Sequence, residues 1–319
     1  MDMNQSASPL NAFPQAGPKV AVLMAAFNGM QWLPDQLESI LKQDHVSVTV
    51  FISVDQSTDG TEAWVDGIAD QNDRIRVLPH GKVFGGAAPN FFRLIVEIDF
   101  SDFDFVSLAD QDDLWLPNKL SRAIEVLKHE QAQAYSSNVV AFWSNGKKAF
   151  INKSQTQVRW DFLFEAAGPG CTYVFTQHFA RALQSQILAQ QSLAKKIGLH
   201  DWFIYAFARA SQAKWVIDDE ALMLYRQHEK NQVGTNKGLK ALIHRAQKVT
   251  SGWAFEQSRT IAKAVGLQKS SSIRFGLNGS RLGYFWLGCN AWRCRRKTQD
   301  QIIFALICFY LTLVGQKQS

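Results

Sequence analysis

The order of apolar runs in the N-terminal part constrains the fold of this chain more than any other feature. An almost unbroken apolar run, residues 19–27, is typical of a strand that is covered on both faces. Apolar residues at helical spacing follow over 31–43, with Pro34 near the start, where proline is tolerated. Strands that alternate with helices predict an α/β layer with a mostly parallel sheet. The same alternation predicts further strands over 47–54, 74–78 and 104–109 and helices over 90–98 and 117–128.

Carboxylates gather where these predicted strands end. Asp110, Asp112 and Asp113 directly follow the last of the strands named above, and Asp55 follows the second. Ligands of such sheets bind at the carboxyl ends of the strands. Carboxylates this close together repel one another and need a countercharge, for which a hard divalent cation with oxygen ligands is the natural choice. The cluster therefore predicts a metal site that takes up a diphosphate.

The pattern loosens beyond residue 134, and we divide the chain into three parts. The first part, 1–18, is polar and lacks the apolar core of a signal peptide, so we expect a flexible leader. An α/β domain over 19–236 and a basic, aromatic-rich helical region over 237–319 follow. Within the second part we predict strands over 138–142, 147–152, 171–175, 214–217 and 221–225 and helices over 179–189 and 202–210. The four cysteines show neither metal-ligand nor disulfide-framework spacing, which indicates a reducing compartment.

Charge is distributed unevenly along the chain. Residues 237–319 carry 14 Lys and Arg against 2 Asp and Glu, a net charge of +12, whereas residues 1–236 carry 20 against 26, a net charge of −6. This asymmetry predicts an anionic partner for the C-terminal region. The region lacks zinc, helix-turn-helix and RNA-binding signatures, so we favour an anionic membrane surface and predict no nucleic-acid partner, with a nucleic-acid-binding tail as the alternative. The apolar run 302–314 is shorter than the ~20 residues that a spanning helix needs, which fits peripheral attachment. A helical bundle that caps the domain or forms a dimer is the alternative.

Five short segments, in a fixed order, carry a resemblance to a known family. The chain resembles the family 2 glycosyltransferases of GT-A fold, and within them the bacterial rhamnosyltransferase-like members, over roughly residues 19–235. The segments are Ala26-Phe27-Asn28-Gly29, Val54-Asp55-Gln56-Ser57-Thr58-Asp59-Gly60-Thr61, Gly85-Gly86-Ala87-Ala88-Pro89-Asn90-Phe91, Asp110-Gln111-Asp112-Asp113-Leu114-Trp115 and Pro117-Asn118-Lys119-Leu120.

The resemblance implies a pocket for a nucleotide-sugar donor. Asn28, Asp55, Asp59 and Asn90 are its nucleotide-sugar-binding candidates, with Asp55 facing the base or ribose. The family often has two adjacent aspartates followed by Gly-Ser-Thr-Asp, whereas this chain has Asp55-Gln56-Ser57-Thr58-Asp59. The departure leaves open which aspartate takes the base-binding position. For Asp55 and Asp59, the shaping of a turn and the capping of a helix are the structural alternative.

The same resemblance assigns a metal to the carboxylate cluster. Asp112 would be the main ligand of a Mg²⁺ or Mn²⁺ that bridges the two phosphates of the donor. Asp110 would bind the ribose or the metal. A Tyr-Arg-x-His element recurs in this group, and it implies His228 as a further metal ligand and Arg226 as a phosphate contact. A structural role for His228 is equally open.

The acceptor side is assigned from two further segments. The segment 168–172, with Gly170, Cys171 and Thr172, resembles the family's acceptor loop, and a plain structural turn is the alternative. Asp201, followed by Trp202, stands where the family has its general base. A carboxylate at the start of a helix either caps the helix or takes a proton from an acceptor hydroxyl, and we favour the base.

These observations predict an inverting, metal-dependent glycosyltransferase, with dTDP-L-rhamnose as the predicted donor. The predicted acceptor is a glycan or lipid-linked glycan of cell-surface polysaccharide assembly, at the cytoplasmic face of a bacterial membrane. The alternatives are another UDP- or dTDP-sugar donor, or a catalytically silent nucleotide-binding module at the membrane.

Overall fold

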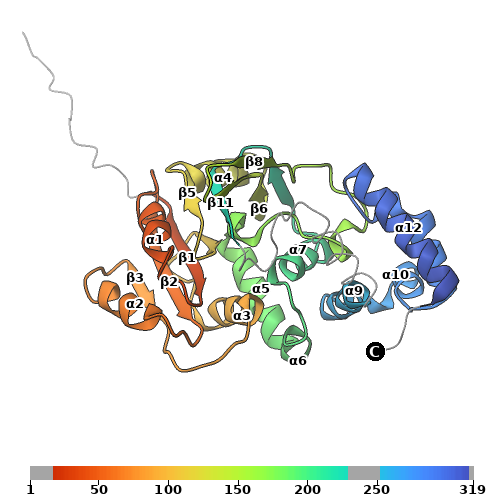
Figure 1. The fold of residues 1–319 in the computed structure, drawn as a ribbon, viewed down its shortest axis with the longest axis horizontal. Coiled ribbons are helices and arrows are strands. Elements are labelled where there is room, and N and C mark those ends of the chain that lie inside the picture. Colours follow the sequence, from red (N-terminus) through yellow and green to blue (C-terminus); the bar gives the residue numbers. More distant parts are fainter. Residues whose placement is uncertain (1–16, 229–251, 316–319) are drawn as a thin grey trace, which may run out of the picture.

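Two sheets and a group of C-terminal helices make up the part of the chain that the structure describes (Figure 1). The structure is a computed structural model and describes residues 17–228 and 252–315. The larger sheet has seven strands in the order β10-β6-β9-β4-β1-β2-β3, and the smaller has four in the order β5-β11-β7-β8. Strands β1 to β4 are parallel, and β9 runs antiparallel to β4 and β6.

The strands match the alternation of apolar runs closely in the N-terminal half. The larger sheet contains β1 (Lys19–Ala26), β2 (Ser47–Val54), β3 (Ile75–Val77), β4 (Phe105–Ala109), β6 (Ala134–Ser137), β9 (Val174–Thr176) and β10 (Trp215–Asp218). The smaller contains β5 (Leu114–Trp115), β7 (Val139–Trp143), β8 (Lys148–Ile151) and β11 (Met223–Gln227). The helices of the α/β part are α1 (Leu33–Leu41), α2 (Thr61–Ala69), α3 (Ala87–Glu97), α4 (Lys119–His129), α5 (Gln177–Ala189), α6 (Gln191–Ala194) and α7 (His200–Ala210).

Helices cover both faces of the larger sheet, which explains why β1 is apolar almost throughout. Leu23 packs into a cluster with Phe91 of α3 and Phe203 of α7. Met24, its neighbour, points to the other face and packs with Leu37 of α1 and Ile124 of α4. Successive side chains of a strand alternate between faces, so each face of β1 requires its own apolar set. The prediction of a mostly parallel sheet flanked by helices is confirmed.

The prediction of a strand over 171–175 is wrong in its first half. Gly170–Thr172 forms a 3-10 turn, and β9 begins only at Val174. The turn forms because Thr172 donates hydrogen bonds to the carbonyl of Pro169 from both its backbone N–H, at 3.0 Å, and its hydroxyl, at 2.7 Å. The short strands β5 and β6 were not predicted either.

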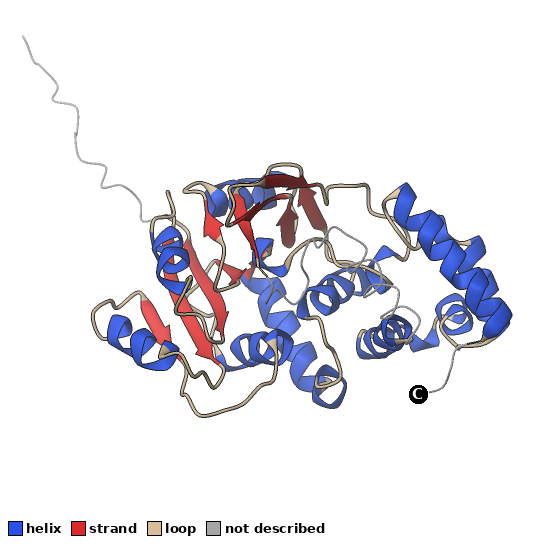
Figure 2. Cartoon of the chain, viewed as in Figure 1, coloured by secondary structure: helices blue, strands red, loops and turns tan. Residues whose placement is uncertain are grey.

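The C-terminal region is helical where it is described, as predicted (Figure 2). Its helices are α9 (Trp253–Ala264), α10 (Ser271–Gly276), α11 (Arg281–Cys289) and α12 (Thr298–Val314). None of the helices within 17–228 and 252–315 has the length and apolar character that crossing a membrane requires. The expectations for the leader up to residue 16 and for residues 229–251 lie outside the described residues.

A buried ion network fastens the C-terminal region to the α/β part. Asp161 is fully buried and lies 2.8 Å from Arg209 Nη1 and 3.4 Å from Arg296 Nη1. The hydroxyl of Tyr205 donates a third hydrogen bond to this carboxylate at 2.8 Å. Buried charges persist only when they are paired, so this network fixes the position of the segment between α11 and α12.

Candidate active site

One cavity of about 1540 Å³ opens at the carboxyl ends of β1, β2 and β4. Asn28, Asp55 and the acidic loop after β4 line one side of it, and Asp201 lines another. Helices α9 and α12 contribute further walls, through Phe255 and Ile303 among others. The cavity therefore draws its surface from both the predicted α/β domain and the predicted C-terminal region, and the boundary between them stays a prediction.

Asn28 and Asp55 line the cavity and also organise the loops around it. Asn28 has a positive φ of 46°, a conformation that asparagine tolerates better than most residues, and its side-chain oxygen accepts the N–H of Thr58 at 2.8 Å. The carboxylate of Asp55 accepts the N–H groups of Phe84, at 2.8 Å, and Gly85, at 2.9 Å. It also accepts the N–H of Gln56 at 2.9 Å. A carboxylate offers about four lone-pair sites, so Asp55 retains acceptor capacity for a ligand beyond these three bonds.

Asp59 and Asn90 differ in their relation to the cavity. The carboxylate of Asp59 accepts the N–H groups of Met30 and Thr61, both at 3.1 Å, and Asp59 is not among the cavity-lining residues. These contacts match the alternative of a turn that leads into α2. Asn90 lines the cavity and donates to the carbonyl of Ser53 at 2.9 Å, while its buried side-chain oxygen has no partner among the described residues.

Three predicted metal ligands, Asp110, Asp112 and His228, line the same part of the cavity. His228 Nε2 lies 2.6 Å from a carboxylate oxygen of Asp112, and the imidazole stacks on Trp32 with 4.1 Å between ring centres. Neighbouring ligand atoms of an octahedral Mg²⁺ lie roughly 2.9 Å apart, given metal–ligand distances near 2.1 Å. The 2.6 Å contact is a direct hydrogen bond between the two side chains, so a hard cation held between them would take the place of the shared proton and would move the two ligand atoms slightly apart.

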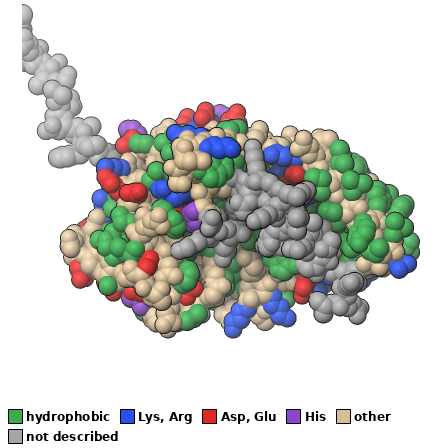
Figure 3. Space-filling model, viewed as in Figure 1, with side chains coloured by type: hydrophobic (Ala, Val, Ile, Leu, Met, Phe, Trp, Pro, Cys, Tyr) green, Lys and Arg blue, Asp and Glu red, His purple; other side chains and the backbone are tan. Residues whose placement is uncertain are grey.

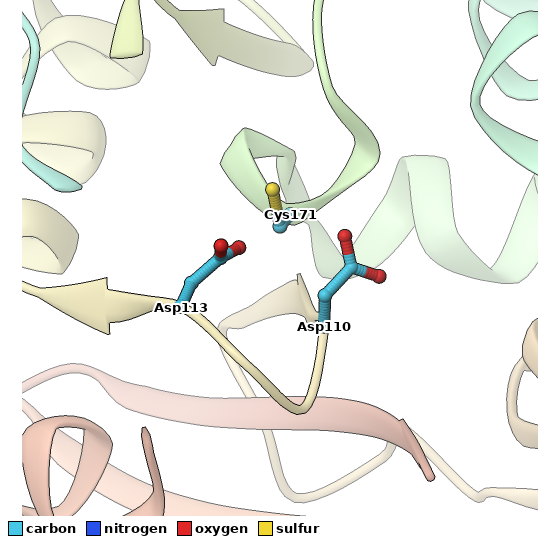
Figure 4. A group of neighbouring side chains, drawn as sticks. All are labelled: Asp110, Asp113 and Cys171. Carbon is cyan, nitrogen blue, oxygen red and sulfur yellow. The ribbon is translucent and has the colours of Figure 1, made fainter. Parts of the chain in front are cut away.

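A second group shares Asp110 with the first and extends behind the cavity wall through the buried Asp113 and Cys171. Ligand atoms of Asp110, Asp113 and Cys171 all lie within 4.8 Å of one another (Figure 4). Burial raises the pKa of Asp113 and of the Cys171 thiol well above their usual values, and burial together with the charge of Asp112 raises the pKa of Asp110 to about 7. A protonated thiol is a poor ligand for a hard cation, so this group fits Mg²⁺ or Mn²⁺ less well than the cavity-facing residues do.

Arg226 holds the acidic loop in place and does not line the cavity. Its Nε donates to the carbonyl of Asp112 at 2.7 Å, and its backbone N–H donates to the Asp113 carboxylate at 3.0 Å. The guanidinium also lies over the ring of Phe142, 4.7 Å from its centre. In this arrangement Arg226 positions the predicted metal ligand, and its direct contact with a phosphate stays a prediction.

Asp201 lies at the start of α7 and faces the cavity. Burial raises the pKa of its carboxyl to about 6, while a hydrogen bond from the Trp202 N–H at 2.8 Å acts in the opposite direction. A base with this pKa is deprotonated at neutral pH and still takes up a proton readily. Lys153, which also lines the cavity, lowers the pKa of Asp201 through its charge.

At Gly170, the loop that faces Asp201 leaves no room for a side chain. A Cβ at this position would lie 2.6 Å from Nε2 of His200 and 3.3 Å from Cβ of Asp201. His200 is buried against Phe91, with 4.1 Å between ring centres, and burial lowers its pKa to about 3, so it is neutral. Gly170 and Trp202 line the cavity, and their acceptor-side role stays a prediction.

The structure places the other two acceptor-side candidates behind the cavity wall. Cys171 and Thr172 are fully buried and are not among its lining residues, because the 3-10 turn directs them inward. The sequence interpretation also missed several lining residues. Lys153 follows β8 without a motif around it. Ile303 and Ile307 belong to the apolar run that the sequence assigned to membrane attachment or to a capping bundle, and Asp300 lies just before it, so no local pattern marked them as cavity residues.

The mostly parallel α/β sheet with an acidic loop at its carboxyl edge agrees with the GT-A fold of nucleotide-sugar transferases. Residues 18–202 match the model of the glycosyltransferase-like family 2. The chain is 40% identical over 285 residues to the dTDP-rhamnosyl transferase RfbG of Shigella flexneri, covering 89% of this chain and 98% of that protein. The chain thus belongs to the family 2 glycosyltransferases, and the resemblance predicted from sequence is confirmed.

Other similarities are more distant. The UDP-Glc:alpha-D-GlcNAc-diphosphoundecaprenol beta-1,3-glucosyltransferase WfgD of Escherichia coli is 22% identical over 156 residues, 49% of this chain and 58% of that protein. The structure resembles S. aureus TarS 1-349 with a TM-score of 0.55 and 15% identity, and the match covers 92% of this chain and 80% of that one. It also resembles the mannosyltransferase PcManGT of Pyrobaculum calidifontis in complex with GDP-Man and Mn²⁺. The TM-score is 0.51 at 16% identity, and the match covers 94% of this chain and 88% of that one. The two structures support the fold.

Proposed function

We propose that this glycosyltransferase moves L-rhamnose from dTDP-L-rhamnose to a glycan or lipid-linked glycan in cell-surface polysaccharide assembly. The observation that carries the proposal is the similarity to a dTDP-rhamnosyl transferase across 98% of that protein's length. Asp112 with His228, and Asp201, in one cavity support it from the structure. Donor and base need a shared space of this kind, because the acceptor hydroxyl must reach the anomeric carbon while it is deprotonated.

The reaction is a single displacement with inversion at the anomeric carbon. Asp201 removes the proton of the acceptor hydroxyl, the oxygen attacks the anomeric carbon, and the bond from that carbon to the diphosphate breaks. Asp110, Asp112 and His228 would hold Mg²⁺ or Mn²⁺, which supplies positive charge for the departing nucleoside diphosphate. Arg226 keeps the acidic loop in position, and Asn28 and Asp55 face the nucleotide.

Lys153 and Gly170 have supporting roles on the acceptor side. The hydrogen bond from the Trp202 N–H and, after it, the charge of Lys153 lower the pKa of the Asp201 carboxyl against the larger effect of burial. Gly170 lets the cavity-lining loop pack directly against His200 and the start of α7, because a side chain there would collide with His200 and crowd Asp201. We also propose that the acceptor is met at the cytoplasmic face of an anionic membrane, to which the basic C-terminal region attaches.

A donor panel tests the proposal. Purified protein is incubated with dTDP-L-rhamnose, UDP-glucose or GDP-mannose, with Mn²⁺ or with chelator, and with a bacterial lipid extract as acceptor source. We expect release of nucleoside diphosphate from dTDP-L-rhamnose with Mn²⁺, and loss of about 10² to 10⁴ in rate for Asp201→Asn without loss of donor binding. If only another donor is turned over, that donor replaces dTDP-L-rhamnose in the proposal. If no donor is turned over, catalysis is rejected in favour of a silent nucleotide-binding module.

A further inference from the structure

Helix α12 is apolar on all sides although one side of it faces solvent. Asp300 is the single charged residue among its 17 residues. One stripe, with Phe304, Cys308 and Leu311, is buried against the rest of the protein. A helix that is apolar all round normally has both faces covered, so the exposed side of α12 lacks the partner that its composition predicts.

The exposed stripe is continuous along the helix. We call it the α12 apolar face and define it as Ile302, Leu306, Phe309, Tyr310 and Leu313, with exposed fractions of 57%, 63%, 37%, 54% and 76%. These positions are spaced i, i+4, i+7, i+8 and i+11, which places them on one side of an α-helix. Exposed apolar surfaces of this extent mark interaction sites in soluble proteins.

Helix α11 extends this surface. Phe285 is 50% exposed and packs on Phe309 with 5.9 Å between ring centres, and Leu282 is 70% exposed. Apolar side chains gather over α12 at the right-hand end of the molecule (Figure 3). The surface therefore involves two helices.

The charge of the C-terminal helices favours an anionic partner for the α12 apolar face. From residue 257 to the end of the sequence Asp300 is the single acidic residue, and it pairs with Arg295 at 3.6 Å on the cavity side. Arg274 and Arg281 are exposed, and Arg281 lies beside Gly315 at the end of α12. A second copy of the chain would bring like charges together, whereas an anionic bilayer accepts apolar side chains and attracts arginine.

The α12 apolar face also adjoins the cavity. Asp300, Ile303 and Ile307 line the cavity, and they occupy the stripe next to the exposed one, since each residue advances about 100° around the helix. Ile303 is 54% exposed while it lines the cavity, so it lies at the mouth. A surface docked at the α12 apolar face would thus lie next to an entrance of the catalytic cavity.

We propose that the α12 apolar face, with Leu282 and Phe285, docks onto an anionic lipid bilayer and turns the cavity mouth at Ile303 toward it. The consequence for the acceptor rests on the proposed function: a lipid-linked sugar would reach Asp201 from the bilayer along α12. The docking itself requires no glycosyl transfer, so it is tested independently of catalysis.

Vesicle co-sedimentation tests the docking. Wild-type protein, Leu306→Glu/Leu313→Glu and the control Leu188→Glu, an exposed leucine of α5, are mixed with phosphatidylglycerol-containing or pure phosphatidylcholine vesicles. We expect wild type and control to bind anionic vesicles, and the double variant to bind roughly tenfold or more weakly, with an unchanged melting temperature. Binding to phosphatidylcholine should be weaker by roughly tenfold, because the basic residues no longer contribute.

Three results would overturn the proposal. They are a wild type that stays in the supernatant, a double variant that binds undiminished, and a wild-type oligomer that dissociates in the double variant without vesicle binding. The last result would assign the face to a second copy of the chain. Donor hydrolysis measured in parallel separates the outcomes, since its absence would reject the proposed function and leave the docking result intact.

A fluorescence measurement tests the orientation. Exposed Cys289 is replaced by serine, and an environment-sensitive label is attached at Ile303→Cys or, as the control, at Leu188→Cys. We expect a blue shift with anionic vesicles at position 303 and none at position 188. An unchanged spectrum at 303 in protein that still binds vesicles would contradict the proposed orientation of the mouth.

Discussion

Replacing Gly170 by alanine tests whether the geometry around Asp201 sets the rate. The added Cβ would lie 2.6 Å from His200 Nε2, which is closer than ordinary contact, 3.4 Å, by roughly 0.8 Å. His200 cannot retreat easily because it is packed on Phe91 at 4.1 Å, so the strain passes to the loop or to the start of α7, where Asp201 is located. A displacement near 1 Å costs about 10²-fold in a reaction that depends on position.

The assay compares kcat and melting temperature for Gly170→Ala and for a matched control, Gly67→Ala. Nothing lies within 4 Å of a Cβ at Gly67, inside α2, so this variant should retain wild-type kcat and gain about 1 kcal/mol of helix stability. We expect kcat of Gly170→Ala to fall about 10²-fold while donor affinity changes little. A wild-type kcat for Gly170→Ala would refute the assignment of this loop to the acceptor side of the base.

Two further predictions concern protonation and stability. Burial raises the pKa of Asp201 to about 6, and a base that must be deprotonated loses activity below that pH. At saturating Mn²⁺, log kcat/KM should therefore rise with a slope of about one up to pH 6 and level off above it. A flat profile between pH 5 and 7 would contradict this role. Asp161→Ala leaves Arg209 and the buried Arg296 without their carboxylate. We expect urea titrations to show a free energy of unfolding that is lower by about 3–5 kcal/mol. A loss of less than about 1 kcal/mol would contradict the structural role of the network.

Much of the α/β part was predictable because its strands are covered on both faces. Burial on both faces requires continuous apolar runs, and β2, Ser47–Val54, was predicted with the boundaries it has. The carboxylates at strand ends were predictable for a related reason, since parallel strands bring their carboxyl ends to one edge. Asp55, Asp110 and Asp112 accordingly line one cavity.

Features that depend on tertiary contacts were not predictable in the same way. β5 has two residues, and its place is fixed by pairing with β11, more than a hundred positions away in the sequence. The direction of the Arg226 side chain depends on the carbonyl of Asp112, which no local pattern reveals. The wall formed by α12 was missed because an apolar helix gives no indication of which stripe faces a cavity.

The central claim is that Asp112 and His228 hold a divalent cation that binds the donor diphosphate opposite Asp201. Calorimetric titration of dTDP-L-rhamnose into wild-type protein and Asp112→Ala, each with and without Mn²⁺, tests this claim most directly. We predict that Mn²⁺ strengthens donor binding to wild type at least about tenfold and has little effect on the variant. Equal enhancement by Mn²⁺ in both proteins would contradict the assignment of the metal to Asp112.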